Sequence, residues 1–475
     1  MKTPIYSALQ QFIAEDILRL HMPGHAGGRG INNVALSRIA EMDVTEVPGL
    51  DDLHLPEGVI KESKVLLADA LGAEESFFLV NGASSGLQAL CMSLEHRKVL
   101  VPRNAHRSMF AGMVLSGLEP VYLPCEINTD LGIVTGVAPD TVQRYLNRIS
   151  KIKAVFLTSP SYYGTCSDVG QIASITHQKQ IPLLVDEAHG GHFPFHPSYP
   201  ATALQQGADA VVNGLHKTWP VLNQGAVLSV GKGIVDINKV NNAVSLLTTT
   251  SPSYLIMASI ELARSRLEDE GQYLLEQARI LANRYKLKID QLKGFKCAGD
   301  QLQQMDDVTG MDPLKVVVAV DDLGLSGEQV AEVLRTQYKV QVEMSMPRVI
   351  LAMLSMFHTE RDWELFFRAL EDISQKYYAP GSSHGRYLDP PYPTVVIPPR
   401  QAFFAKKRSC KLAEAVGLVA GEMVAAYPPG IPCLLPGELI TGEVLDYLNQ
   451  LRANDVHIHG PEDASLHYLK VIDEF

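Results

Sequence analysis

Two pairs of polar residues each follow an apolar run that is typical of a buried strand. Asp186 and Glu187 come directly after the first run, and His216 and Lys217 come shortly after the second. In open α/β sheets, the loops beyond the carboxyl ends of the strands form the crevice where ligands bind. A carboxylate and an amine at two such strand ends therefore predict a site for a group that interacts with both.

A glycine- and serine-rich turn offers a third chemical feature. The segment NGASSG, which contains Ser84, Ser85 and Gly86, follows an apolar strand and opens a helical pattern. Free backbone N–H groups and the positive end of the helix dipole favour an anion at such a turn. We expect a phosphate to bind there.

These three features together are what pyridoxal 5'-phosphate requires. The cofactor needs a lysine that forms a Schiff base, an acid that keeps its pyridine nitrogen protonated and an anchor for its phosphate. Each feature alone is weak evidence, because a lysine after a strand is usually solvated and a strand-end aspartate is more often a helix cap. A nicotinamide cofactor is disfavoured, since no GxGxxG motif follows a strand.

The elements that must position these residues alternate along the chain. Strand-like and helix-like segments alternate from residue 98 to residue 213, which predicts a mostly parallel, helix-covered sheet in an α/β fold. Residues 252–288 carry an apolar stripe at helical spacing. A β-α-β-β-α order then indicates a small α+β domain, followed by a proline-rich linker and by helices expected over 402–416 and 442–453. The predicted organisation is an N-terminal arm (1–50), a cofactor-binding large domain (51–290), a small α+β domain (291–378), a linker (379–396) and a C-terminal domain (397–475).

The bulk composition restricts the classes of partner. The chain has 41 basic and 53 acidic residues, a net charge of −12, which disfavours nucleic acid and anionic membranes. It shows no signal peptide and no spanning segment, so we expect a cytoplasmic protein. Its six cysteines are dispersed without a CxxC pair, which favours reduced thiols over disulfides or zinc ligands, and no metal site is expected.

A set of motifs resembles a known family. The motifs include HMPGH, DVTEVPGLDDLH, FFLVNGASSG, VPRNAHRS, TSPSYYG, VDEAHG, TTTSPSY, YPPGIPCLLPGE and HGPED, and they extend from residue 21 to residue 463. With this spacing, the chain resembles the Orn/Lys/Arg decarboxylases, in the shorter form without an N-terminal receiver-like domain. The resemblance implies a fold-type I, aspartate aminotransferase-like large domain, a small α+β domain and a C-terminal α+β domain.

The resemblance also implies roles around the cofactor ring. Lys217 would form the Schiff base and Asp186 would pair with the pyridine nitrogen. Ala188 would pack on one face of the ring, and His106 would stack on the other. Without the resemblance, His106 reads as a cap of the helix that follows it. His189 is a candidate donor of the proton to the substrate Cα, with Lys217 as the alternative.

The phosphate and the subunit interface are implied in the same way. Ser84, Ser85 and the backbone up to Gly86 would hold the phosphate with help from His216. Thr250 and Ser251 resemble a stretch that reaches the cofactor phosphate of a neighbouring subunit, which predicts a homodimer or higher homo-oligomer with the active site near the interface. The alternative for this stretch is an ordinary helix start.

Three carboxylates are candidates for the substrate. Glu438 could receive the distal cation of a basic amino acid, or it could be a charge at a helix N terminus. Asp51 and Asp52 could line the same entrance, or they could cap the helix that starts near Gly58.

The chain departs from the family pattern at four positions. Gly214 stands where the family usually has a serine that contacts the phosphate, and Ala26 stands where a lysine is common. Trp219 and Pro220 occupy positions where small residues are common. Weaker cofactor retention and a narrower substrate pocket are both consistent with these departures.

The predicted function is decarboxylation of a basic amino acid with pyridoxal phosphate, giving an amine and carbon dioxide in polyamine-type metabolism. Arginine is the first expectation, followed by lysine or ornithine. An alternative is another fold-type I enzyme, an aminotransferase or a lyase; an aminotransferase needs an arginine for the substrate carboxylate, and Arg348 is the nearest candidate. A catalytically degenerate member with a regulatory or scaffold role is the non-enzyme alternative.

Overall fold

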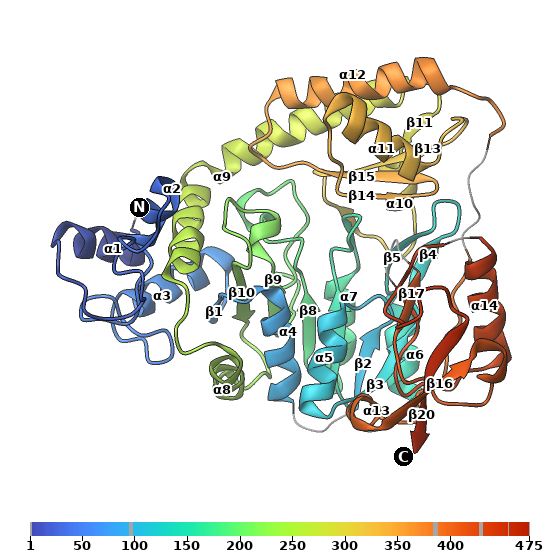
Figure 1. Cartoon of the computed structure of the whole chain (residues 1–475), viewed down its shortest axis with the longest axis horizontal. Coiled ribbons are helices and arrows are strands. Elements are labelled where there is room, and N and C mark those ends of the chain that lie inside the picture. Colours follow the sequence, from blue (N-terminus) through green and yellow to red (C-terminus); the bar gives the residue numbers. More distant parts are fainter. Residues whose placement is uncertain (1, 95–97, 383–387, 427–430, 455, 475) are drawn as a thin grey trace.

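The computed structural model describes residues 2–94, 98–382, 388–426, 431–454 and 456–474. Its centre is a seven-stranded sheet (Figure 1). All neighbouring strands pair in parallel except those that flank β10, which runs against both of its neighbours. The predicted mostly parallel sheet is confirmed, whereas the antiparallel strand β10 is not among the strands expected from the sequence. In spatial order the strands are β1 (Glu75–Leu79), β10 (Ala226–Val230), β9 (Ala210–Asn213), β8 (Leu183–Asp186), β6 (Ile152–Thr158), β2 (Lys98–Pro102) and β3 (Glu119–Leu123).

Helices cover both faces of this sheet, which is why its strands read as continuous apolar runs. One face packs against α4 (Gly82–Ser93), α5 (Arg107–Ser116) and α8 (Ile237–Leu247). The other face packs against α6 (Pro139–Arg148) and α7 (Val169–His177). Both faces are therefore closed, and the ends of the strands are left to hold a ligand.

The N-terminal segment is tied to the long helix α9 (Tyr254–Ile289). Glu261 of α9 accepts the backbone N–H groups of Ile5 (3.0 Å) and Tyr6 (2.8 Å), and thereby caps α1 (Pro4–Ala14). Ile5 and Leu9 are buried in a core that α9 shares with the small domain. This part of the chain also contains α2 (Val34–Ala40) and α3 (Val59–Leu71).

The helix α9 runs from the large sheet to a four-stranded antiparallel sheet (Figure 1). The predicted β-α-β-β-α order is present, with β11 as an additional strand. Its elements are β11 (Phe295–Cys297), β13 (Lys315–Val320), α11 (Gly327–Tyr338), β14 (Met344–Met346), β15 (Val349–Met353) and α12 (Glu360–Tyr377). Short connecting elements are β4 (Glu126–Asn128), β5 (Ile133–Gly136), β7 (Thr165–Cys166), α10 (Gly299–Gln303) and β12 (Gly310–Met311).

The helix expected over residues 402–416 is wrong. Helix α13 (Pro399–Phe404) ends early, and β16 (Lys406–Lys411) pairs with β20 (Tyr468–Glu474). The segment contains good helix formers, but a partner strand from the far end of the chain overrides that local preference. The predicted helix over 442–453 is confirmed as α14 (Gly442–Ala453). A small sheet of β17 (Val424–Ala426), β18 (Pro432–Leu434) and β19 (Ile458–His459) completes this region.

Across the described residues, every helix is too short or too polar to cross a bilayer.

Gly86 supplies a test of how closely α4 lies on the sheet. A Cβ atom at this position would lie 2.6 Å from Leu79 Cδ1 and 2.9 Å from Val212 Cγ1. We expect Gly86→Ala to lower the free energy of unfolding by about 1–3 kcal/mol, because overpacking displaces the helix. A lower urea midpoint would show it.

Gly442→Ala is the matched control, since a Cβ atom at Gly442 meets no heavy atom within 4 Å. Equal urea midpoints for the two variants would contradict close packing at Gly86.

Candidate active site

Asp186 and Glu187 point in different directions because side chains alternate along a strand. Asp186 ends β8 and is buried, and its Oδ1 accepts the N–H of Ala188 at 3.1 Å. Glu187 instead accepts the N–H of Ala203 (2.8 Å) and the Nδ2 of Asn213 (2.9 Å). Glu187 therefore holds the loop, and Asp186 is the carboxylate available to a ligand.

Lys217 lies at the end of the neighbouring strand, in a short 3₁₀ turn after β9. Its Nζ is 3.1 Å from Nε2 of His189. Burial lowers the pKa of Lys217, and the charge of Asp186 partly opposes that shift. Gly214 is one of the positions where the chain departs from the family pattern. A Cβ atom on Gly214 would lie 3.1 Å from Ala188 O and 3.3 Å from Lys217 Cδ, so the side chain of Lys217 occupies the space that a larger residue at position 214 would need.

His106 caps the helix that follows it and lies near both charges of the site. It is the N-cap of α5, and its Nδ1 accepts the N–H of Ser108 at 3.3 Å, so the capping alternative is confirmed. Burial is the main cause of its lowered pKa, and the charges of Asp186 and Lys217 also act on it. The role of His106 in stacking on the cofactor ring stays a prediction. The effect of Asp186 and Lys217 on its pKa is consistent with that position.

The N terminus of α4 has the properties of an anion cradle. Gly82 donates its N–H to Gln224 O at 2.8 Å, and no side chain of the described residues caps the helix. Ser85 donates its hydroxyl to Gly82 O at 2.8 Å, so its oxygen is left as an acceptor and the backbone supplies the free donors. His216 Nδ1 lies 3.1 Å from Gly225 O, which leaves Nε2 available.

The most informative residue that the sequence did not reveal is Lys315. It begins β13 in the small domain, its side chain is only 2% exposed, and its Nζ lies 2.9 Å from Nδ1 of His189. Burial lowers the pKa of Lys315 to about 8 and holds that of His189 well below its usual value. A lysine at the start of an apolar strand gives no signal in the sequence, because only the tertiary fold brings it to the site.

Lys315, His189 and Lys217 form a row of three hydrogen-bonded side chains. A cavity of ≈ 60 Å³ borders the two lysines of this row. It lies between the large and small domains and is lined on one side by Lys217 and Thr218, and on the other by Asp312 and Lys315. A cavity of this volume has room for water, and the buried polar atoms Thr218 Oγ1 and His192 Nδ1 belong to residues that line it.

Glu438 is a correction to the predicted substrate site. Its side chain is fully buried, and both carboxylate oxygens accept from the guanidinium of Arg103, with Nη2 at 3.0 Å from Oε2. Arg103 also donates from Nε to Pro432 O at 2.8 Å. The pair joins the end of β2 to the C-terminal region and is not open to a substrate cation. The helix alternative is wrong as well, since α14 begins at Gly442.

The other predicted carboxylates perform local structural work. Asp51 Oδ2 accepts the N–H groups of Gly58 (2.8 Å) and Ile60 (2.9 Å), as expected for a cap of α3. Asp52 Oδ1 accepts the N–H of His54 at 2.8 Å. Within this chain, both carboxylates are engaged by backbone N–H groups of their own loop and of the start of α3.

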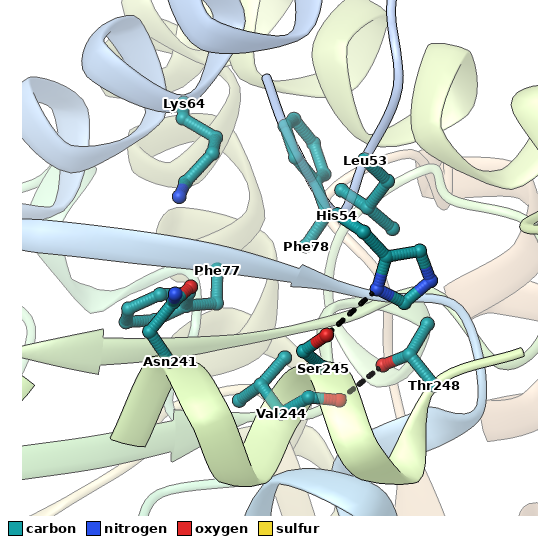
Figure 2. Close-up of a pocket in the computed structure, with 9 residues that line it drawn as sticks. All are labelled: Leu53, His54, Lys64, Phe77, Phe78, Asn241, Val244, Ser245 and Thr248. Atoms are coloured by element: carbon teal, nitrogen blue, oxygen red, sulfur yellow. Dashed lines mark hydrogen bonds between the residues drawn. The ribbon is translucent and has the colours of Figure 1, made fainter. Parts of the chain in front are cut away.

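A second pocket lies beside these residues (Figure 2). His54 reaches from this loop to α8, where its Nδ1 lies 3.0 Å from Ser245 Oγ, and its Nε2 lies 2.9 Å from Thr249 O. Lys64 pairs with Glu75 at 3.0 Å. The pocket has a volume of only ≈ 20 Å³. The hydrogen bonds of His54 hold the segment that leads to Thr250 and Ser251, both of which are exposed.

Two further positions have structural explanations. The indole of Trp219 donates to Gly191 O at 2.7 Å and packs on Phe195, with 5.5 Å between ring centroids. Its bulk is therefore used in packing. Arg348 pairs with Asp321 at 2.9 Å, which engages the arginine that an aminotransferase would need.

No group of three or more metal-ligating side chains occurs in the described ranges. The same ranges contain all six cysteines as free thiols.

Comparison with known proteins gives consistent matches over the whole chain. The family model described as "Orn/Lys/Arg decarboxylase, major domain" matches residues 3–362, and the one for the C-terminal domain matches residues 387–469. The chain is 35% identical to "Arginine decarboxylase" of Bacillus subtilis, over 100% of this chain and 98% of the relative. It is 36% identical to "Arginine decarboxylase" of Bacillus anthracis, with the same coverage.

Solved structures show the same fold. The constitutive lysine decarboxylase of Escherichia coli superposes with a TM-score of 0.84 at 21% identity, over 99% of this chain and 82% of that chain. The ureidoglycine-glyoxylate aminotransferase of Bacillus subtilis superposes with a TM-score of 0.55 at 14% identity, over 69% of this chain and 87% of that chain. The predicted fold-type I architecture is confirmed.

The Arg103–Glu438 pair can be tested by removing one charge. We expect Glu438→Gln to lower the free energy of unfolding by about 3–5 kcal/mol, because it leaves a buried guanidinium without its counter-charge. A lower urea midpoint and faster proteolysis of the C-terminal region would report the loss.

Asp473→Asn is the control, because Asp473 pairs with Arg408 at 3.2 Å near the surface, where ion pairs contribute little. If Glu438→Gln instead kept its urea midpoint and raised only the KM for the amino acid, Glu438 would be a substrate ligand after all.

Proposed function

The chain belongs to the Orn/Lys/Arg decarboxylase family, and from this premise we propose that it removes the carboxyl group of arginine as carbon dioxide, using pyridoxal phosphate. Its arginine decarboxylase relatives in two Bacillus species support this substrate over lysine or ornithine. The single observation that carries the proposal is the placement of a largely buried amine, Lys217, and a buried carboxylate, Asp186, at the ends of the neighbouring strands β9 and β8.

The residues present fit the cofactor. Burial raises the pKa of Asp186 even though Lys217 and His106 oppose the shift, so this carboxylate lacks a sufficient cationic partner. A protonated pyridine nitrogen is such a partner, and the uncapped N terminus of α4 suits the phosphate. When bound, the cofactor supplies a sink for the electron pair left on Cα as carbon dioxide departs.

The protein's own residues would supply charge and protons. Asp186 would keep the ring nitrogen protonated, and Ala188 and His106 would hold the ring between them. Lys217 would bind the cofactor, release it to the substrate and then carry a proton that Cα receives. Because the pKa of His189 is depressed, its ring is neutral near pH 7 and has one nitrogen that donates and one that accepts.

The two alternatives have less support. An aminotransferase requires a free arginine for the substrate carboxylate, and Arg348 is engaged with Asp321. A scaffold protein has no use for Asp186 and Lys217 in a desolvated site, where burial of each charge costs stability.

The activity can be tested with a substrate panel. The protein is incubated with pyridoxal phosphate and arginine, lysine or ornithine, and carbon dioxide and amine are measured. We expect amine and carbon dioxide in equal amounts, with the highest kcat/KM for arginine. Lys217→Ala should lower kcat by about two to four orders of magnitude, because the group that binds and protonates is lost.

A second readout does not depend on turnover. After borohydride reduction and digestion, the pyridoxyl mass should lie on the peptide that contains Lys217. The control variant Lys179→Ala, which changes an exposed lysine, should carry the label on the same peptide. A keto acid formed without carbon dioxide would refute the decarboxylase, and a label on other lysines would refute the assignment of Lys217.

We also propose a homodimer whose active sites contain residues of both subunits. Thr250 and Ser251 are exposed, as expected of side chains that face a neighbouring subunit. Large apolar side chains of the N-terminal segment are exposed too, with Leu20 at 87% and Val34 at 73%, and a second copy of the chain would cover them.

Mixing of variants tests this arrangement. Lys217→Ala and the double variant Thr250→Val, Ser251→Ala should each be impaired alone, and a refolded mixture should regain activity, because one site of each mixed dimer then has all three native residues. Sedimentation should show a dimer. A mixture that regains nothing although mixed dimers form would place these residues outside the neighbour's site.

A further inference from the structure

Lys315, His189 and Lys217 form a continuous row. Nζ of Lys315 lies 2.9 Å from Nδ1 of His189, and Nε2 of the same ring lies 3.1 Å from Nζ of Lys217. The row begins in the small domain, on β13, and ends at the lysine expected to bind the cofactor. Both distances are those of hydrogen bonds, so a proton can pass along the row without any group moving far.

Simple hydrogen-bond chemistry limits the protonation of this row. An ammonium group only donates, and a neutral imidazole has one donor and one acceptor. Two ammonium groups cannot both donate to one neutral ring that keeps its proton. One lysine is therefore neutral, and the ring proton lies on the nitrogen that faces it.

When Lys217 is the neutral amine that reacts, the positive charge of the row lies on Lys315. Asp312 and Glu343 both raise the pKa of Lys315 against the effect of burial, whereas the charge of Lys217 lowers it. The ring of Tyr162 lies 5.7 Å from Nζ of Lys315 and adds a cation–π contact. Lys217 must be a neutral amine to act as a nucleophile. With Lys315 charged, Nδ1 of His189 accepts and Nε2–H faces Lys217.

The neighbouring cavity provides a source of protons for Lys315. Thr218 Oγ1 and His192 Nδ1 both belong to residues that line it, and among the described residues neither buried atom has a hydrogen-bond partner. Buried polar atoms of this kind are usually satisfied by water. A water molecule in this cavity would lie beside Lys315, which lines the same space.

Building on the decarboxylation proposed above, we propose that Lys315 is a positioning residue that recharges Lys217 with protons through His189. The N–H bond of the Lys315 ammonium breaks as Nδ1 of His189 gains a proton. The Nε2–H bond then breaks as the neutral amine of Lys217 becomes an ammonium, which gives its proton to Cα. Lys315 regains a proton that solvent hydronium delivers through the water of the cavity, a turn of the His189 ring returns its N–H to the side of Lys217, and no electrons are exchanged with an outside group.

The proposal fixes the direction of the pH dependence. The pKa of Lys315 is about 8, so its ammonium form dominates below this pH and is lost above it. We expect kcat of the wild-type holoenzyme with arginine to fall as the pH rises through about 8. The charged or titratable groups that face Lys315 are Asp312, Glu343, His189, Lys217 and Tyr162.

Substitutions at Lys315 separate this role from a structural one. Lys315→Met should lower kcat by about two orders of magnitude or more with little change in KM, and should abolish the fall near pH 8. Lys315→Arg should restore part of kcat and move the fall to higher pH, because the guanidinium stays charged. Lys286→Met is the matched control, since Lys286 is a partly buried lysine that donates to Pro313 O and not to the row.

A spectroscopic readout tests the coupling without turnover. The visible absorbance of the bound cofactor reports the proton on the nitrogen that joins it to Lys217. Loss of the Lys315 charge should raise the pH midpoint of this absorbance, since the protonated form is no longer repelled by a neighbouring cation. Lys286→Met should leave the midpoint unchanged. His189→Gln, a second variant that leaves Lys315 in place, should also abolish the fall in kcat near pH 8.

The outcomes distinguish this inference from the function on which it rests. Absence of amine and carbon dioxide with the wild-type protein would refute the decarboxylase itself. Normal wild-type turnover, together with a Lys315→Met variant that keeps the wild-type kcat, pH profile and absorbance midpoint, would overturn only the role of Lys315. If Lys315→Met does not fold, an unchanged pH profile in His189→Gln overturns that role equally.

Discussion

The rest of the site depends on one constraint: an amine and a carboxylate are removed from water at the ends of two neighbouring strands. Asp186 and Lys217 are costly to bury, and each is stabilised by what surrounds it: the N–H of Ala188 for the carboxylate, and His189 for the amine. The sheet, closed on both faces by helices, leaves the strand ends as the place where such groups can converge on a ligand.

The small domain is part of this chemistry and not only a cover for it. Lys315 comes from β13 and reaches the ring of His189, so the relative position of the two domains decides whether the row of three residues exists. The C-terminal region is fixed in another way, by the buried pair of Arg103 and Glu438. Glu438, which the sequence suggests as a substrate ligand, therefore joins the C-terminal region to the large domain.

The sequence predicts those parts of the fold and site that are encoded locally. Asp186, Lys217 and the turn before α4 stand directly after apolar runs, and the alternation of helices and strands predicts the mostly parallel sheet. Features made by distant segments are not accessible in this way. The pairing of β16 with β20 overrides the helix preference of its residues, and the partner of Glu438 is far away in the chain. Lys315 is hidden for the same reason, since nothing in an apolar strand indicates that its first residue meets His189.

A crystal structure of the protein with pyridoxal phosphate tests the central claim most directly. We predict continuous density between the cofactor and Nζ of Lys217, with the ring nitrogen at hydrogen-bond distance from Asp186, the ring between His106 and Ala188, and the phosphate at the N terminus of α4. A ring nitrogen turned away from Asp186, or a phosphate bound elsewhere on the chain, would contradict it.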